Sequence, residues 1–182
     1  MHITEILRKI GQFSDEEIKL FESVITRRSI SKNEVILQEG DISQSFYFIN
    51  SGSFFQFFVK DIDEVIIDLH TGNEWMYNHD SLIGQEPSLT TIKAFTDAEV
   101  LELKLVSFHK LVTRSDAFLQ FNRVLDQPRN RTYLFDNALS PAEKYSYINQ
   151  AKPLITKTFP VKMIASYLKI APETLSRVRG QY

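Results

Sequence analysis

The chain has 182 residues, of which 43% are hydrophobic and 24% are charged, and its formal net charge is −2. These values are typical of a folded globular protein with one large domain or two small ones, and no apolar run approaches the ~18 residues of a membrane span. The absence of cysteine excludes disulfides, thiolate zinc sites and cysteine-held iron–sulfur clusters. The polar segment 1–11 does not resemble a secretory signal, and we expect a cytoplasmic protein without a membrane partner.

Two short amphipathic helices are predicted at the start of the chain, over 3–10 and 14–25. Apolar side chains recur in both segments at spacings of three and four residues, which is the period of an α-helix. The second segment opens on Ser14, with Glu17 three residues later. This spacing is typical of a capping box at a helix N-terminus.

From about residue 29 to residue 104 the pattern changes to short strands separated by turns. The predicted strands cover 34–38, 45–49, 53–59, 65–69, 90–95 and 99–105. Turns rich in Gly, Asn and Asp separate them, as at Asn50-Ser51-Gly52. Strands at this regular short spacing indicate an antiparallel sandwich or jelly roll, with its Phe-rich strands filling the interior.

A helical pattern returns over 107–139. Phe118, Phe121 and Leu125 approximate a repeat of three and four residues, so they form one apolar stripe. Two interpretations are open, because the stripe either pairs with a second copy of the chain or packs against the jelly roll. Pro128 predicts a kink or a break in this helix, since proline removes one backbone hydrogen bond and clashes with the preceding turn.

The C-terminal stretch 159–182 is typical of two short helices joined by a tight turn. Pro172 stands where the second helix can begin, because the N–H that proline lacks would form no intrahelical hydrogen bond in the first turn. Leu175 and Val178 lie three residues apart on the inner face of that helix. Lys169 and Ile170 lie between the two helices.

Positive charge is concentrated in the C-terminal part of the chain. From Ser140 onward, seven Lys and Arg residues stand against two Glu, a net charge of +5. The remainder holds 14 basic and 21 acidic residues, a net charge of −7. A basic tail on an acidic body indicates nucleic-acid binding.

Ser140 and Glu143 form a second predicted capping box, which opens a helix over 141–150.

The polar face of the second C-terminal helix carries side chains suited to DNA. Glutamate can accept from cytosine N4, arginine can bind guanine O6 and N7, and hydroxyl groups suit phosphates. The alternative is a plain amphipathic αα-hairpin that closes a small core, since it would have the same periodicity. The candidate DNA contacts are Lys162, Glu173, Thr174, Ser176, Arg177 and Arg179.

The segment 164–179, IASYLKIAPETLSRVR, resembles the DNA-binding helices of the Crp–Fnr family, the cyclic-AMP receptor protein and its relatives. Within it, PETLSR fits the family's recognition-helix pattern R-E-T-V-x-R, or a close variant, at every position except the first. There Pro172 replaces the family's arginine, so that residue's contact is lost. Lys169 is a second departure, because Gly often stands there in the family's turn and a positive φ is strained for a residue with a side chain. The resemblance implies that Glu173 and Arg177 read bases and that Thr174 contacts a phosphate.

The strand-rich half is similar to the same family's cyclic-nucleotide-binding jelly roll, in the segments 34–54 and 92–103. The resemblance implies an α+β chain in three parts. These are a jelly-roll domain with flanking helices over 1–114, a long connecting and dimerisation helix over 115–139, and a helix-turn-helix DNA-binding domain over 140–182. It also implies a homodimer that holds its two recognition helices one DNA turn apart, with the apolar stripe at the dimer interface.

The nucleotide-binding cassette departs from the family pattern. Members that bind cyclic AMP place a Gly-Glu pair and then an arginine on the ribose and the phosphate. The stretch from Gly72 to Ala94 contains no arginine, and Ser88 stands about where it belongs. Lys93 would replace it only by pointing inward. A phosphate without a guanidinium loses its charge-assisted partner, so we expect neither cyclic AMP nor cyclic GMP to bind with physiological affinity.

Aromatic and hydroxyl side chains in the same stretch are candidates for binding another small-molecule effector. These are Trp75, Tyr77, His79, Ser88, Thr90 and Thr91. The alternative is that the aromatic side chains only fill the core of the jelly roll. His70 and His79 are weak candidates for metal or haem ligands, so no metal or cofactor is expected. No catalytic constellation is recognisable, and we do not expect an enzyme.

Two functions from different classes are consistent with the sequence. The first is a sequence-specific transcriptional regulator that binds double-stranded DNA as a homodimer, without responding to cyclic AMP. The second is a small-molecule sensor or a protein-interaction module whose helical tail docks a partner instead of DNA. Salt-dependent binding to a palindromic duplex distinguishes the first from the second.

Overall fold

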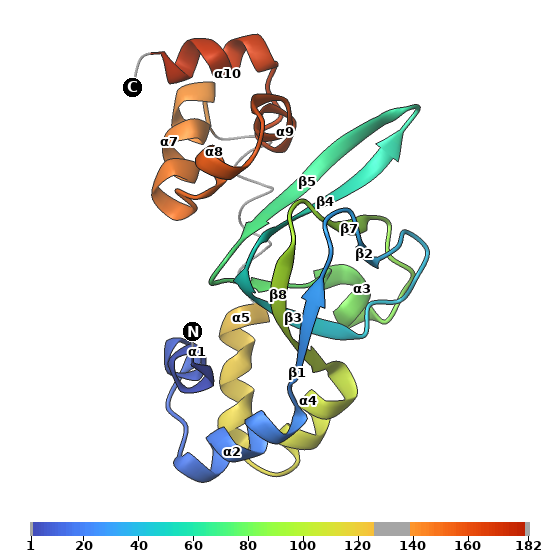
Figure 1. Ribbon diagram of the computed structural model, residues 1–182, viewed down its shortest axis with the longest axis vertical. Helices are drawn as coiled ribbons and strands as arrows, with labels where there is room; N and C mark the ends of the chain where they lie inside the picture. Colours follow the sequence, from blue (N-terminus) through green and yellow to red (C-terminus); the bar gives the residue numbers. More distant parts are fainter. Residues whose placement is uncertain (1, 126–138, 181–182) are drawn as a thin grey trace.

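The computed structural model describes residues 2–125 and 139–180. The strands in these residues are β1 Thr26–Ile30, β2 Val35–Leu37, β3 Ser45–Ser51, β4 Ser53–Lys60, β5 Asp63–Thr71, β6 Trp75–Met76, β7 Thr91–Ala94 and β8 Ala98–Lys104. The helices are α1 Ile3–Ile10, α2 Asp15–Val24, α3 His79–Gly84, α4 Leu105–Val112, the 3₁₀ helix η1 Asp116–Phe121, α5 Asn122–Leu125, α7 Pro141–Ala151, α8 Ile155–Thr158, α9 Val161–Tyr167 and α10 Pro172–Arg179. The strands lie between two groups of helices (Figure 1).

The strands form two four-stranded antiparallel sheets, in the orders β1-β8-β3-β6 and β2-β7-β4-β5. Apolar side chains from both sheets meet in the interior, among them the fully buried Ile49, Phe54 and Val100. This arrangement confirms the predicted sandwich. The strands β1 and β6 are absent from the prediction, because β1 has four polar residues in five and β6 has only two residues.

The two N-terminal helices form where they are predicted. In the capping box of α2, Ser14 Oγ accepts from the Glu17 amide at 3.3 Å, and the Ser14 amide donates to Glu17 Oε2 at 2.7 Å. Ser115 Oγ donates to the other carboxylate oxygen of Glu17 at 2.5 Å. These hydrogen bonds, that from Ser115 foremost, lower the pKa of Glu17 below its ordinary value. They also connect α2 to the start of η1.

The apolar stripe predicted for the dimer interface lies inside the protomer. Phe118 and Phe121 are 0% and 1% exposed, and the ring of Phe121 stacks on that of Phe21 in α2 at 5.6 Å. Their assignment to a dimer interface is therefore wrong, because their own chain already covers their surface. Leu125 is half-buried against the same core. The described part of the predicted long helix is η1 followed by the short α5, while Pro128 and the positions up to 138 lie outside the described residues.

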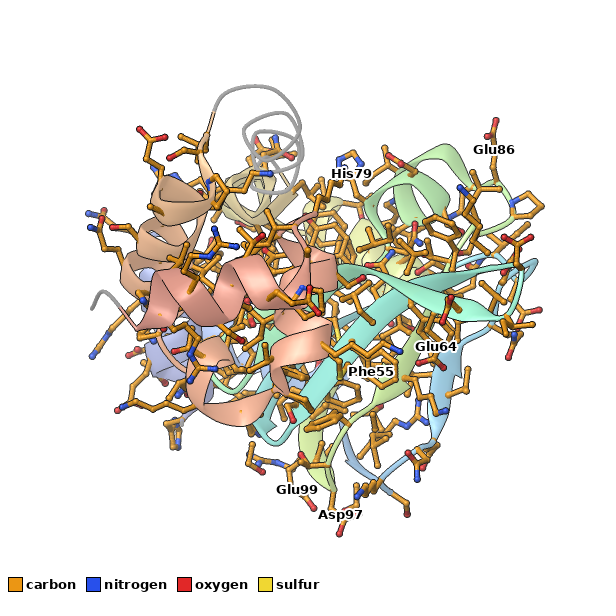
Figure 2. The ribbon with its side chains drawn as sticks, turned by 90° about the horizontal axis from the view of Figure 1, so that it is seen from above. Phe55, Glu64, His79, Glu86, Asp97 and Glu99 are labelled. Atoms are coloured by element: carbon orange, nitrogen blue, oxygen red, sulfur yellow. The ribbon has the colours of Figure 1, made fainter. Side chains whose placement is uncertain are left out.

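Of the C-terminal helices, α8 and α9 pack on β5, which is an edge strand of its sheet, and α7 and α10 pack on these helices and on each other. An edge strand presents a row of N–H and C=O groups that no neighbouring strand pairs. The Ile66 amide donates to Ser166 Oγ of α9 at 3.0 Å, and the Leu69 carbonyl accepts from Lys152 Nζ at 2.9 Å. Phe55 of β4 projects on the side of the sheet where these helices lie (Figure 2) and belongs to the apolar core that the sheet shares with them. The helices are thus fixed to the sheet by both packing and hydrogen bonds.

Candidate functional site

The pair of helices α9 and α10 is closely packed around the turn 168–171. Ala165 is fully buried, and its carbonyl accepts from the Ile170 amide at 3.0 Å. Lys169 has a φ of +55°, the left-handed conformation that its place in the turn predicts. The buried Lys144 of α7 donates from Nζ to the Leu168 carbonyl at 3.0 Å, and this bond satisfies a carbonyl at the end of α9.

Helix α10 is amphipathic, with its apolar face toward α7 and α9. Leu175 and Val178 are buried in that face, as predicted. Of the candidate DNA contacts, Thr174 is half-buried. The others are exposed, namely Lys162, Glu173, Ser176, Arg177 and Arg179. The structure therefore places one candidate contact on α9 and five on α10, with the long charged side chains outward.

The positive charge of this part of the chain is divided between surface and interior. Lys144 and Lys152 are engaged in contacts within the protein. The five remaining basic residues are exposed: Lys157, Lys162, Lys169, Arg177 and Arg179. The surface available to an anionic partner is therefore less basic than the sequence count indicates, although it remains clearly positive.

A cavity of about 520 Å³ lies between the jelly roll and α9. Five of the six candidate effector residues line it: Trp75, Tyr77, His79, Ser88 and Thr90. Thr91 lies outside the described lining, because its Oγ1 accepts from the Glu39 amide at 3.1 Å and from Gln38 Nε2 at 3.4 Å. Lys93, the one residue considered as a substitute cation, is also outside that lining. Figure 2 shows His79 and one further lining residue, Glu86, around α3.

The cassette wall of this cavity is a closed network of neutral polar groups. Asn78 Nδ2 donates to Ser88 Oγ at 2.9 Å and to Thr90 Oγ1 at 2.8 Å. Gln56 Nε2 donates to Thr90 Oγ1 at 2.6 Å, and Ser88 Oγ donates to the Thr90 carbonyl at 2.6 Å. Ser88 is 2% exposed. The Ser88 hydroxyl is thus buried and bonds within the protein.

Three residues missing from the predicted effector set, Asp68, His70 and Glu74, line the cavity where it meets the C-terminal helices. The Thr71 amide donates to Glu74 Oε1 at 2.6 Å, which fixes this carboxylate in the turn after β5. Lys152 Nζ lies 2.8 Å from Glu74 Oε2 and 3.5 Å from Asp68 Oδ1. Nothing in the local sequence connects Lys152 with residues so distant along the chain, so the sequence pattern does not predict this cluster.

The cationic side chains among the described lining residues are Lys9 of α1, Arg123 of α5 and Lys169 after α9. Arg123 donates to the Ile10 carbonyl at 2.9 Å. Two come from helices and the third from the turn between α9 and α10, so none comes from the cassette. Among residues 2–125 and 139–180, no group of three or more His, Asp or Glu is arranged to hold a metal ion. In the same residues, no helix has the length and apolar character needed to cross a bilayer.

The two sheets and the helices at both ends form a β jelly roll with flanking helices. Residues 27–115 match the family described as the cyclic nucleotide-binding domain, a region that runs from β1 through α4. No curated protein matches the chain in sequence.

Several solved structures share this architecture. The catabolite activator protein of Thermus thermophilus is 21% identical with a TM-score of 0.60, over 97% of this chain and 85% of that chain. FixK2 from Bradyrhizobium japonicum is 17% identical with a TM-score of 0.67, over 87% and 84%. The c-di-GMP-responsive global regulator CLP of Xanthomonas campestris is 14% identical with a TM-score of 0.60, over 92% and 91%. At these identities the similarity establishes the fold alone.

Proposed function

We propose that this protein is a sequence-specific DNA-binding transcriptional regulator of the Crp–Fnr type. In this proposal α9 and α10 form a helix-turn-helix, and α10 enters the major groove of DNA. The observation that carries the proposal is the outward face of α10, where Glu173, Arg177 and Arg179 are exposed while the apolar face is buried. The shared fold supports it, because the solved structures with this fold include a catabolite activator protein and a protein described as a global regulator that links signalling to gene expression.

The proposal gives each exposed side chain a separate role. Arg177 binds guanine O6 and N7, and Glu173 accepts from cytosine N4. Lys162, Thr174, Ser176 and Arg179 contact phosphates, which positions the helix without reading sequence. A good bidentate contact with a base contributes about 1–3 kcal/mol of discrimination, so Arg177 is expected to dominate specificity.

We infer that the active species is a cytoplasmic homodimer that binds DNA and does not act as an enzyme. Helix α10 has eight residues, and one such helix covers only part of a typical binding site. Two copies related by a twofold axis would read two half-sites of a palindrome. The dimer contact must lie outside Phe118 and Phe121, since both are buried in the protomer.

We infer also that cyclic AMP is not the effector. A cyclic phosphate at the cassette would face the Ser88–Asn78–Thr90 network without a guanidinium. Two charge-assisted hydrogen bonds of about 1.5–3 kcal/mol each correspond to a roughly 10²- to 10⁴-fold loss of affinity. The cavity beside this wall remains available to a small molecule of different charge.

A selection of bound duplexes from a random-sequence DNA pool tests the proposal. We expect enrichment of an inverted repeat whose half-sites lie about 10 base pairs apart, with an affinity that falls steeply as salt is raised. In Thr174→Ala, affinity should fall by a similar factor on all sequences, since a phosphate contact carries no sequence information. A pool that shows no enrichment after repeated selection at low salt would refute the proposal.

A second candidate is a sensor or interaction module whose helical tail binds a protein. One observation favours it, namely that the tip of the β4–β5 hairpin extends toward the end of the molecule that carries α7–α10 (Figure 1). This tip exposes Asp61, Asp63 and Glu64, and carboxylates at that end would repel a phosphate backbone. This candidate predicts no duplex enrichment and no effect of Thr174→Ala on partner binding.

A further inference from the structure

The wall of the cavity and the attachment of the C-terminal helices share two carboxylates. Asp68 and Glu74 line the cavity, and both also contact Lys152, which lies directly after α7. The Lys152 side chain is 12% exposed, and its Nζ also donates to the Leu69 carbonyl of β5. One ammonium group therefore links α7 to the edge of the sheet at the boundary of the cavity.

The helix α9 reaches the same cavity from its C-terminal end. Tyr167, its last residue, and Lys169, in the turn before α10, are both lining residues. Tyr167 is 4% exposed, so it forms part of the solid wall. A molecule in this cavity would touch the cassette on one side and the α9–α10 pair on another. The cavity is therefore in contact with α9 and with the turn that leads into α10.

The described lining carries four carboxylates, Asp68, Glu74, Asp80 and Glu86, against three cations, Lys9, Arg123 and Lys169, so its balance of charge favours a cationic ligand. Trp75, Tyr77 and Tyr167 bring three aromatic rings to the lining, and the face of such a ring attracts an ammonium group. The carboxylates of Asp68 and Glu74 lie in the same lining. The cassette wall offers neutral hydroxyls and amides where a cyclic phosphate would need a cation. A volume of about 520 Å³ lies within the ~300–1,000 Å³ typical of small-molecule sites.

We propose that the cavity binds an organic amine with an aromatic or apolar body, and that its ammonium group competes with Lys152 for Glu74 and Asp68. The exchange replaces one positive charge by another, so the carboxylates stay paired and no charge is buried alone. Release of Lys152 loosens α7 and α9 from β5. The effect on DNA affinity rests on the proposed function, whereas amine binding and the release of Lys152 do not.

Calorimetry with three indole compounds tests the charge preference on the unmodified protein. Tryptamine is a cation, indole is neutral and indole-3-acetate is an anion, while the ring is the same in all three. We expect tryptamine to bind most tightly and indole-3-acetate least. Equal affinities for the cation and the anion, or a preference for the anion, would overturn the proposed ligand class.

Two variants on neighbouring segments locate the ammonium group. In Glu74→Gln, the affinity for tryptamine should fall about 10- to 100-fold, because a charge-assisted contact becomes a neutral one. The control is Glu64→Gln, which makes the same change on an exposed residue of β5 outside the described lining, labelled in Figure 2. Tryptamine affinity that is equal in both variants would overturn the assignment to Glu74.

Hydrogen exchange of the Ile66 amide measures the release of α9, because this amide donates to Ser166 Oγ. We expect saturating tryptamine to speed exchange at Ile66, and Lys152→Met to speed it without any ligand. Exchange that tryptamine leaves unchanged while it binds would overturn the competition with Lys152. If tryptamine binds and loosens α9 but no duplex is bound, the proposed function fails and this inference stands. If a duplex is bound but no amine is, only this inference fails.

Discussion

Lys152 Nζ lies 2.8 Å from Glu74 Oε2, and this contact joins the end of α7 to the turn between β5 and β6. The same lysine donates to the Leu69 carbonyl on the free edge of β5. Ser166 of α9 bonds the Ile66 amide on that edge. The C-terminal helices therefore take the place of a further strand beside β5, since they form hydrogen bonds with backbone groups that an edge strand leaves unpaired.

Replacing Lys152 by Met is expected to reduce the free energy of unfolding by about 1–3 kcal/mol. The change leaves the Glu74 carboxylate without its closest cation, and the side chains of this pair are only 12% and 23% exposed. The expected loss is smaller than the roughly 3–5 kcal/mol of a fully buried pair, because water still reaches both groups. Urea denaturation measures the change. Lys157→Met, on an exposed residue of α8, is the control and should alter stability by less than about 0.5 kcal/mol.

Replacing Phe118 by Ala is expected to destabilise the protomer itself by about 3–5 kcal/mol, because it opens a cavity in the core around η1. Leu119→Ala is the control, since Leu119 is adjacent and 48% exposed. Denaturation should be combined with light scattering to separate unfolding from dissociation. A Phe118→Ala variant with unchanged unfolding and a weakened dimer would restore the interface assignment that the structure contradicts.

Two glycines with the same backbone conformation are expected to respond differently to substitution by Ala. Gly40 and Gly52 have φ values of +93° and +90°, so a side chain is strained at either position. A Cβ at Gly40 meets nothing within 4 Å, whereas one at Gly52 would lie 2.4 Å from the Cβ of Ala98. We expect Gly40→Ala to cost about 1–2 kcal/mol and Gly52→Ala to cost about 1–3 kcal/mol more. Equal costs in thermal denaturation would show that the β3–β4 turn accommodates the added carbon.

Titration with cyclic AMP is expected to show no saturable binding below about 1 mM, which corresponds to roughly −4 kcal/mol. The reason is the neutral network around Ser88, because the cations of the described lining, Lys9, Arg123 and Lys169, come from α1, α5 and the turn after α9 and not from this wall. Isothermal titration calorimetry measures this binding. The folded state of the protein is first verified by its thermal unfolding transition. Low-micromolar binding would contradict this prediction and would mean that a cation reaches the phosphate.

Much of the fold could be predicted because it depends on local signals. The capping boxes at Ser14 and Ser140 form as their spacing predicts, and the Gly- and Asn-containing turn at Gly52 separates β3 from β4. The left-handed conformation of Lys169 agrees with the resemblance, since Gly often stands at this place in the family's turn. In each case the residues that decide the structure are close together in the chain.

The remainder depends on contacts between distant residues. A stripe such as Phe118 and Phe121 has the same periodicity whether it packs on a second copy or on its own chain, and only the position of α1 and α2 decides. The face of the sheet on which the Thr91 side chain lies depends on the register of β7 against β2. A shift of one residue in that register would move the side chain to the other face. The contact between Lys152 and Glu74 joins segments whose separation along the chain leaves no pattern to read.

The most direct test of the central claim compares Arg177→Ala with Arg114→Ala on one enriched duplex and one random duplex. Both arginines are exposed and both changes remove one positive charge, but Arg114 lies just after α4, in the jelly-roll part of the chain. We predict that Arg177→Ala lowers the ratio of specific to non-specific affinity by about 5- to 150-fold, as expected for one bidentate base contact, while Arg114→Ala leaves it unchanged. A ratio unaffected by Arg177→Ala, or reduced equally by both changes, would contradict the account of α10 as the helix that reads DNA.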